Sequence, residues 1–118
     1  MTAGGISVHA VDVAEGRPAV GMEVEIHHLD DDGVWRLVAH GEIGENGALD
    51  HPITRGDGVR EGLYEVRLQI GAFLARRESP PPPFLELVPF RFRVFDIRQH
   101  YHLPIKFTPW GYSLYRGS

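Results

Sequence analysis

The sequence of 118 residues contains no cysteine, so disulfide bonds and thiol chemistry are both excluded. It also has no excess of basic residues, because 12 lysines and arginines stand against 16 aspartates and glutamates. A chain with a formal net charge of -4 carries no basic field that would attract nucleic acid. No apolar run approaches the roughly 20 residues that a membrane span requires. The sequence therefore predicts a protein that binds neither nucleic acid nor a membrane.

The first residues, 1–5, have neither the basic segment nor the apolar segment of a secretory signal, so we expect a cytoplasmic protein. A chain of this length can bury one hydrophobic core but has no room for two. We therefore expect residues 1–118 to form a single domain.

Short segments of alternating apolar and polar residues, separated by glycine-rich and acidic turns, run through most of the sequence. They predict strands over residues 6–13, 22–29, 34–43, 49–53, 63–70 and 84–95, with two more strands between 100 and 118. Asn46-Gly47 is a hairpin signal. Residues 71–77 can form two helical turns, which the prolines at 80–83 must end. Eight short strands with little helix predict an all-β sandwich or barrel.

The last nineteen residues, 100–118, contain the clearest pattern. With a period of two, apolar side chains at 101, 103, 105 and 107 share one face of a strand, and the other face carries His100, His102 and Lys106. Two imidazoles and an ammonium group on one strand face suggest a functional surface in addition to a packed one.

Several stretches resemble the transthyretin-like 5-hydroxyisourate hydrolases: residues 7–12, 82–84, 88–89, 100–102 and 109–118. The terminal Tyr115-Arg116-Gly117-Ser118 is the most specific part, since it separates the hydrolases from the hormone-carrying transthyretins. The resemblance covers essentially the whole chain. It implies an eight-stranded, two-sheet transthyretin-like β-sandwich with one short helix. It also implies a homotetramer whose active sites lie at the dimer–dimer interface.

The activity implied by the resemblance is the opening of the 5-hydroxyisourate ring in urate degradation, by addition of water to an amide-type carbonyl. This reaction requires a base for the water molecule and a donor for the developing oxyanion. His9 and His102 match the two family histidines, and an imidazole suits the base because its ordinary pKa is about 6.5. The implied substrate-binding residues are Lys106, Ser113, Tyr115, Arg116, Gly117 and Ser118.

Two positions depart from the family pattern. Ala48 occupies the place after the hairpin glycine where the family has an arginine, and an alanine offers neither a charge nor a hydrogen-bond donor. Lys106 stands where the family normally has an apolar residue that faces the channel. It follows His102 by four residues, about 13 Å along a strand. We expect Lys106 to supply part of the missing positive charge.

Three functional hypotheses remain open. The chain is a 5-hydroxyisourate hydrolase with a lysine-modified site, or a divergent hydrolase for another cyclic amide or lactone, or a binding protein that uses the channel without catalysis. Retention of both histidines and the terminal motif favours an enzyme, whereas Ala48 favours the second hypothesis.

Zinc is a further alternative, because His9, His100 and His102 are candidate ligands. The family chemistry does not require a metal, and we expect neither a metal nor an organic cofactor. We expect His27, His28 and His51 to lie at the surface. We also expect residues 80–83 to form a rigid loop and not a polyproline ligand for a partner.

Overall fold

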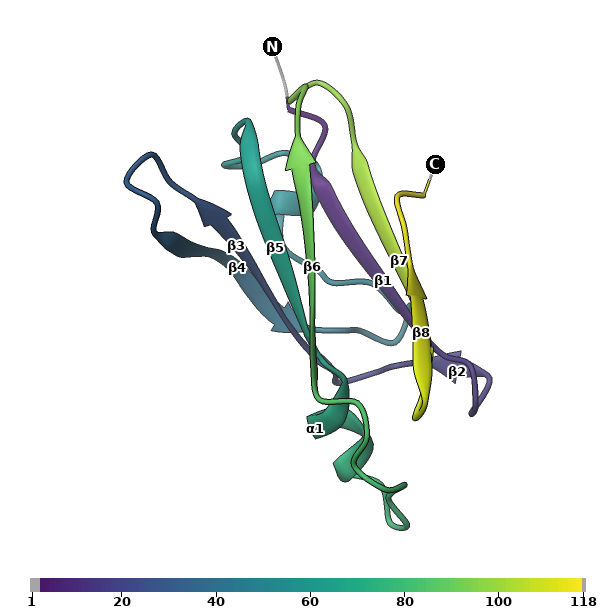
Figure 1. Cartoon of the computed structure of the whole chain (residues 1–118). Helices are drawn as coiled ribbons and strands as arrows, with labels where there is room; N and C mark the ends of the chain where they lie inside the picture. Colours follow the sequence, from purple (N-terminus) through teal and green to yellow (C-terminus); the bar gives the residue numbers. More distant parts are fainter. Residues whose placement is uncertain (1–2, 118) are drawn as a thin grey trace.

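The computed structural model of the chain describes residues 3–117, which form two four-stranded sheets packed face to face (Figure 1). The first sheet has the order β2-β1-β7-β8 and consists of β1 (Ile6–Asp12), β2 (Arg17–Pro18), β7 (Tyr101–Thr108) and β8 (Gly111–Leu114). The second has the order β4-β3-β5-β6 and consists of β3 (Glu23–Leu29), β4 (Trp35–Glu42), β5 (Gly62–Gln69) and β6 (Leu87–Val94). The prediction of an all-β, two-sheet sandwich is confirmed.

The two central strands of the first sheet, β1 and β7, run parallel, whereas all the other strand pairs are antiparallel. Their register pairs Ser7 with His102 and His9 with Pro104. Figure 1 shows this neighbourhood, with purple β1 beside yellow-green β7. The parallel pair thus brings together residues that are more than ninety positions apart in the sequence.

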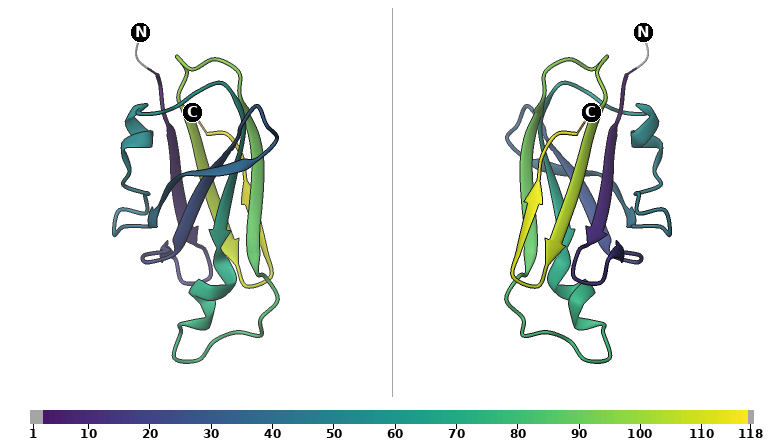
Figure 2. Two further views of the ribbon diagram at one scale, coloured as in Figure 1. Left: turned by 90° about the vertical axis from the view of Figure 1, so that its left-hand side faces the viewer. Right: turned by 90° about the vertical axis from the view of Figure 1, so that its right-hand side faces the viewer.

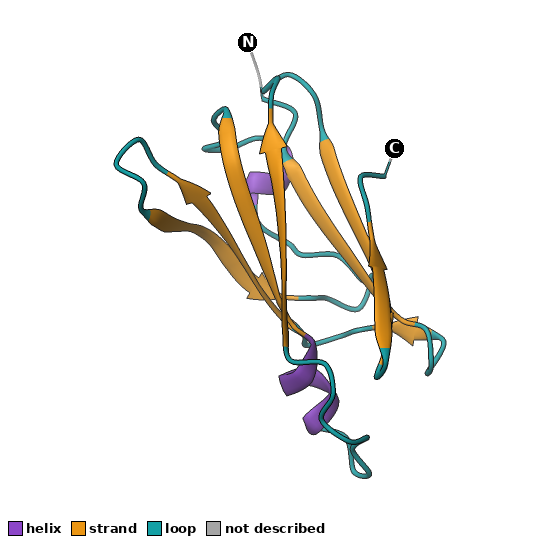
Figure 3. Ribbon diagram, in the orientation of Figure 1, coloured by secondary structure: helices purple, strands orange, loops and turns teal. Residues whose placement is uncertain are grey.

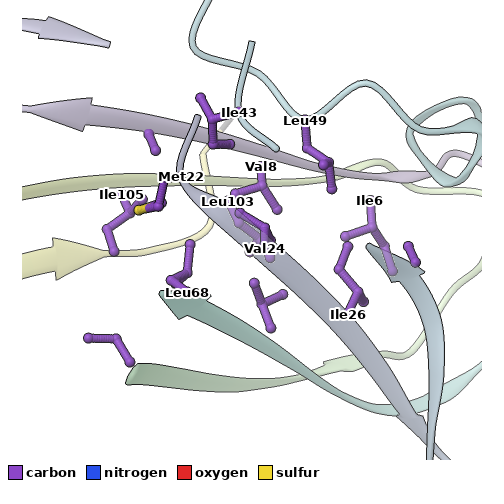
Figure 4. Packing of buried hydrophobic residues seen from close by; sticks show 14 of the residues in the cluster. Ile6, Val8, Met22, Val24, Ile26, Ile43, Leu49, Leu68, Leu103 and Ile105 are labelled. Carbon is purple, nitrogen blue, oxygen red and sulfur yellow. The ribbon is translucent and has the colours of Figure 1, made fainter. Parts of the chain in front are cut away.

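The space between the sheets is filled by the apolar face of each strand, as the alternating pattern predicts. Val8 and Leu103 from the first sheet meet Val24 and Leu68 from the second (Figure 4). All four are at most 2% exposed. Full burial of one such side chain stabilises the fold by about 1.5–3 kcal/mol. Because the inward-facing side chains of the first sheet pack in the core, its polar side chains lie on the outer face.

Two short helices lie outside the sheets (Figures 2 and 3). Helix α1 (Ile70–Ala75) follows β5 directly at one end of the sandwich, close to its predicted place. A 3₁₀ helix, η1 (Pro52–Arg55), packs beside β1. Among the described residues, no helix is long and apolar enough to cross a membrane.

The predicted strand over residues 49–53 is wrong. Only isolated bridges form there, between Ile43 and Leu49 and between His9 and Ala48. Helix η1 then begins at Pro52, which has no backbone N–H to donate to a neighbouring strand. The Nδ1 atom of His51 caps this helix by accepting a hydrogen bond from the N–H of Ile53 at 3.0 Å. Residues 17–18, which lie between the predicted strands 6–13 and 22–29, pair with β1 as the short strand β2.

The expectation that His27 and His28 lie at the surface is also wrong, since they are 9% and 6% exposed. His28 continues the inward alternation of Val24 and Ile26, and its ring lies 4.7 Å from that of Tyr64. Its Nε2–H donates to the carbonyl of Glu61 at 3.1 Å. A bulge between Ile26 and His27 interrupts the pairing with β4 at this point. His51 is half-buried as the cap of η1.

A buried ion pair joins the end of β1 to the segment after α1. The side chain of Asp12 is 2% exposed and that of Arg77 is 23% exposed. The guanidinium of Arg77 donates to Oδ2 of Asp12, while the N–H of Glu15 donates to Oδ1 at 3.2 Å. The guanidinium of Arg77, and not bulk solvent, thus balances the charge of the Asp12 carboxylate.

Candidate active site

The outer face of the first sheet gathers most of the predicted site residues. His9 on β1 and His102 on β7 have ring centroids 6.5 Å apart. Lys106 lies further along the same face of β7, directly opposite Ser113 of β8. The structure therefore brings the two histidines together and places the lysine and the serine as a second pair about four residues away.

His102 is held at three points. Its Nδ1 atom lies 2.7 Å from Oγ of Ser7, and its carbonyl accepts the N–H of Gly117 at 2.7 Å. The ring also abuts Gly117, since a Cβ atom at Gly117 would lie 2.8 Å from Cδ2 of His102. Burial lowers the pKa of His102, and electrostatic repulsion between its protonated form and the neighbouring rings of His100 and His9 lowers it further. The imidazole is therefore neutral near pH 7, which is the form that a general base needs.

Ser7 also contacts a second histidine. Its Oγ atom lies 2.8 Å from Nε2 of His100, and Nδ1 of His100 lies 2.6 Å from the carbonyl oxygen of Gly4. A continuous series of hydrogen bonds thus leads from the backbone of Gly4 to the ring of His102. Ser7 lies in a stretch that carries the family resemblance, but it was not predicted as a site residue, although it shares the face of β1 that carries His9.

His9 rests on the hairpin between Ile43 and Leu49. Its Nε2–H donates to the carbonyl of Asn46 at 3.1 Å. Gly47 has a φ of 85°, and a Cβ atom there would lie only 2.5 Å from Nε2 of His9, so glycine is needed on both grounds. The hairpin predicted from Asn46-Gly47 is present, with the N–H of Gly47 bonded to the carbonyl of Gly44.

Ala48 is the bridge partner of His9. Directly opposed residues in an antiparallel pair project to the same side of the sheet, about 4.5–5.5 Å apart at Cβ. The position at which the resemblance expects an arginine is therefore adjacent to the His9 ring, and an alanine leaves that side of the site without a cation.

The terminal motif returns to β7 after β8 ends. Tyr115 is 48% exposed, and Gly117 pairs with His102. The guanidinium of Arg116 lies 4.4 Å from the ring centroid of Tyr101, and its Nη2 atom donates to the carbonyl of His100 at 3.0 Å. These contacts fix the tail next to the histidines. Ser118 lies outside the described residues.

Within residues 3–117, no group of three histidine, cysteine, aspartate or glutamate side chains has the arrangement of a metal site. Nε2 of His100 and Nδ1 of His102 are already hydrogen-bonded to Oγ of Ser7. The donor set on this face therefore does not fit the zinc alternative.

Three clefts of ≈ 370, ≈ 320 and ≈ 210 Å³ lie elsewhere on the chain, and neither His9 nor His102 lines any of them. The two histidines instead stand on a sheet face.

A family model described as the HIUase/Transthyretin family matches residues 6–117. The chain is 38% identical over 117 residues to 5-hydroxyisourate hydrolase 2 of Rhizobium meliloti (strain 1021), an alignment that covers 98% of this chain and 97% of that protein.

Two solved structures agree with the fold. The 5-hydroxyisourate hydrolase of Klebsiella pneumoniae superposes with a TM-score of 0.77 at 27% identity, over 100% of both chains. Sea bream transthyretin in complex with thyroxine gives a TM-score of 0.85 at 23% identity, over 95% of this chain and 93% of that one, which is a likeness of fold alone. The chain belongs to the HIUase/Transthyretin family.

Proposed function

We propose that the protein hydrolyses 5-hydroxyisourate to 2-oxo-4-hydroxy-4-carboxy-5-ureidoimidazoline in urate degradation. The observation that carries the proposal is the pairing of His9 and His102 on one sheet face, with the terminal segment fixed beside them. The names of the Rhizobium meliloti and Klebsiella pneumoniae relatives support it.

In this proposal His102 is the general base, since its lowered pKa keeps the ring neutral. It takes a proton from the water molecule that attacks the ring carbonyl, and returns that proton to the ring nitrogen that leaves when the carbonyl C–N bond breaks. His9 lies close enough to contact the same small molecule and, when protonated, donates to the developing oxyanion. Ser113 and Tyr115, both exposed, contact the substrate. Arg116 and Gly117 position this segment, and Ser118 is assigned to substrate binding from the sequence motif.

Turnover of freshly generated 5-hydroxyisourate by the purified protein tests the proposal directly. We expect the rate of ring opening to exceed the spontaneous rate, and to be unchanged after exhaustive chelation. Loss of activity with EDTA and its recovery with zinc would replace the acid–base assignment with a metal site. Binding of the substrate without turnover would instead favour a non-catalytic carrier.

We propose a homotetramer with active sites at the dimer–dimer interface. Strands β8 and β6 each form one of the two edges of their sheet, and aromatic side chains that are 48–63% exposed lie on or near them: Phe84, Phe95, Trp110, Tyr112 and Tyr115. Exposed aromatic surface of this kind is typical of interface cores. Light scattering at micromolar concentration is expected to give the mass of four chains, and a monomeric mass would exclude a shared site.

Lys106 is proposed to supply the charge that Ala48 does not. Loss of a hydrogen bond to a charged group costs roughly 1.5–3 kcal/mol, or about ten- to a hundredfold in rate. Replacement of Lys106 by leucine is therefore expected to lower kcat/KM by about that factor, and Ala48→Arg in the same background is expected to restore part of it. Steady-state kinetics on the two variants measure both effects.

If Lys106→Leu leaves kcat/KM unchanged, Lys106 does not compensate for Ala48. The second candidate function then gains support, namely hydrolysis of another cyclic amide or lactone that never required the arginine. Because lysine is a point charge without the planar donor fork of arginine, a site that depends on Lys106 should also accept a wider range of carbonyl-rich rings.

A further inference from the structure

We propose that Ser7 and His100 are positioning residues that fix the tautomer of His102, so that its Nε2 atom carries the lone pair and its Nδ1 atom the proton. The role of this tautomer in catalysis rests on the proposed function, but the tautomer itself is a property of the free protein.

The direction of the hydrogen-bond series is set at its backbone end. A carbonyl oxygen can only accept, so the 2.6 Å contact between the Gly4 carbonyl and Nδ1 of His100 places a proton on that nitrogen. In a neutral imidazole the other ring nitrogen is then an acceptor. Nε2 of His100 therefore accepts the hydroxyl proton of Ser7 across 2.8 Å.

The Ser7 hydroxyl also determines which nitrogen of His102 is protonated. The hydroxyl of Ser7 has one proton, and that proton is already donated to His100. At 2.7 Å its oxygen accepts from Nδ1 of His102, which must therefore be the protonated nitrogen. Nε2 of His102 is left as the only basic nitrogen of that ring. A general base of this kind works only when its lone pair is on the correct nitrogen.

The backbone end of the series is held firmly in place. The N–H of Gly4 donates to the carbonyl of Ile97 at 2.7 Å. A Cβ atom at Gly4 would lie 2.2 Å from the carbonyl oxygen of Gln99, so the two segments approach as closely as glycine allows. The carbonyl that orients His100 is thus part of a tightly packed backbone contact.

The tautomer is measurable without any substrate. Long-range ¹H–¹⁵N spectra of the protein labelled with ¹⁵N-histidine, recorded at pH 7.5, are expected to show His102 protonated at Nδ1. In Ser7→Ala the acceptor is removed, and the His102 signals are expected to shift toward the Nε2–H form or to an exchanging mixture. Ser7→Thr keeps the hydroxyl and should retain the wild-type pattern, as should Ser79→Ala, which makes the same chemical change on an exposed loop.

Kinetics provide the second measurement. Ser7→Ala is expected to lower kcat by about 10- to 100-fold, the range found when partners that orient ligating imidazoles are removed. KM should change little, because Ser7 does not bind the substrate, and Ser7→Thr should restore kcat. His102 protonated at Nε2 in the wild-type protein, or an unchanged His102 spectrum in folded Ser7→Ala, overturns the proposal. An inactive wild-type protein with the Nδ1–H tautomer would instead overturn the proposed function and leave this assignment standing.

Discussion

Replacement of His102 by asparagine is expected to lower kcat for 5-hydroxyisourate hydrolysis by about 100-fold or more, while the protein stays folded. A positioned general base contributes about 10²–10⁴-fold, and an asparagine amide cannot take a proton from water. His9→Asn is expected to have an effect of similar size. Circular dichroism and light scattering on the same samples establish that fold and assembly are intact.

The pH dependence of kcat/KM tests the role of His102 independently. Burial of His102 and the neighbouring imidazoles lower its pKa from 6.5, so the neutral base persists to a lower pH than in a free histidine. In the wild-type protein the acid-side fall of kcat/KM, which reports protonation of the His102 base, should therefore lie below pH 6.5. His40→Asn makes the same change at an exposed histidine of β4 and is the control for the His102→Asn variant. A His102→Asn variant with wild-type kcat would show that the base lies elsewhere.

Replacement of Arg77 by methionine is expected to lower the free energy of unfolding by about 3–5 kcal/mol, because it leaves the carboxylate of Asp12 buried without a cation beside it. A methionine can occupy much of the same volume, so the loss reflects the uncompensated charge. Denaturant unfolding at a fixed protein concentration measures the change, since any assembly makes the apparent stability depend on concentration.

The matched control is Arg17→Met, which breaks the 3.7 Å contact between Arg17 and Glu15. Its side chain is 72% exposed, and such surface pairs contribute about 0–1 kcal/mol. The double variant Asp12→Leu/Arg77→Met should recover much of the stability, because removal of both charges leaves none unpaired. Equal effects of Arg77→Met and Arg17→Met would mean that the Asp12 carboxylate is solvated in solution.

The sandwich was predictable because inward and outward residues alternate so regularly in β1, β3, β5 and β7. Alternation failed where strands are very short or irregular. Strand β2 has only two residues, the segment after Leu49 turns into a 3₁₀ helix, and a bulge interrupts β3 at His27. In these places local pairing and capping override the period of the sequence.

The site was predictable only in part. Alternation and resemblance pointed to His9, His102 and Lys106, and all three lie on the outer face of the first sheet. The contact between Ser7 and His102 depends on the parallel register of β1 with β7, across 95 residues of sequence. No local pattern specifies such a register. The intramolecular contacts of Arg116 could not be predicted for the same reason.

The two glycines that abut the histidine rings have a consequence for how such sites evolve. Gly47 lies against His9 and Gly117 against His102, so each imidazole is braced by main chain on that side and not by another side chain. A residue without a side chain contributes no reactive group, yet any larger residue at either position would displace a ring. The shape of the site therefore depends on the lack of a side chain at these two positions. Substitutions of the side chains around the site should therefore be tolerated more readily than substitutions at these two positions.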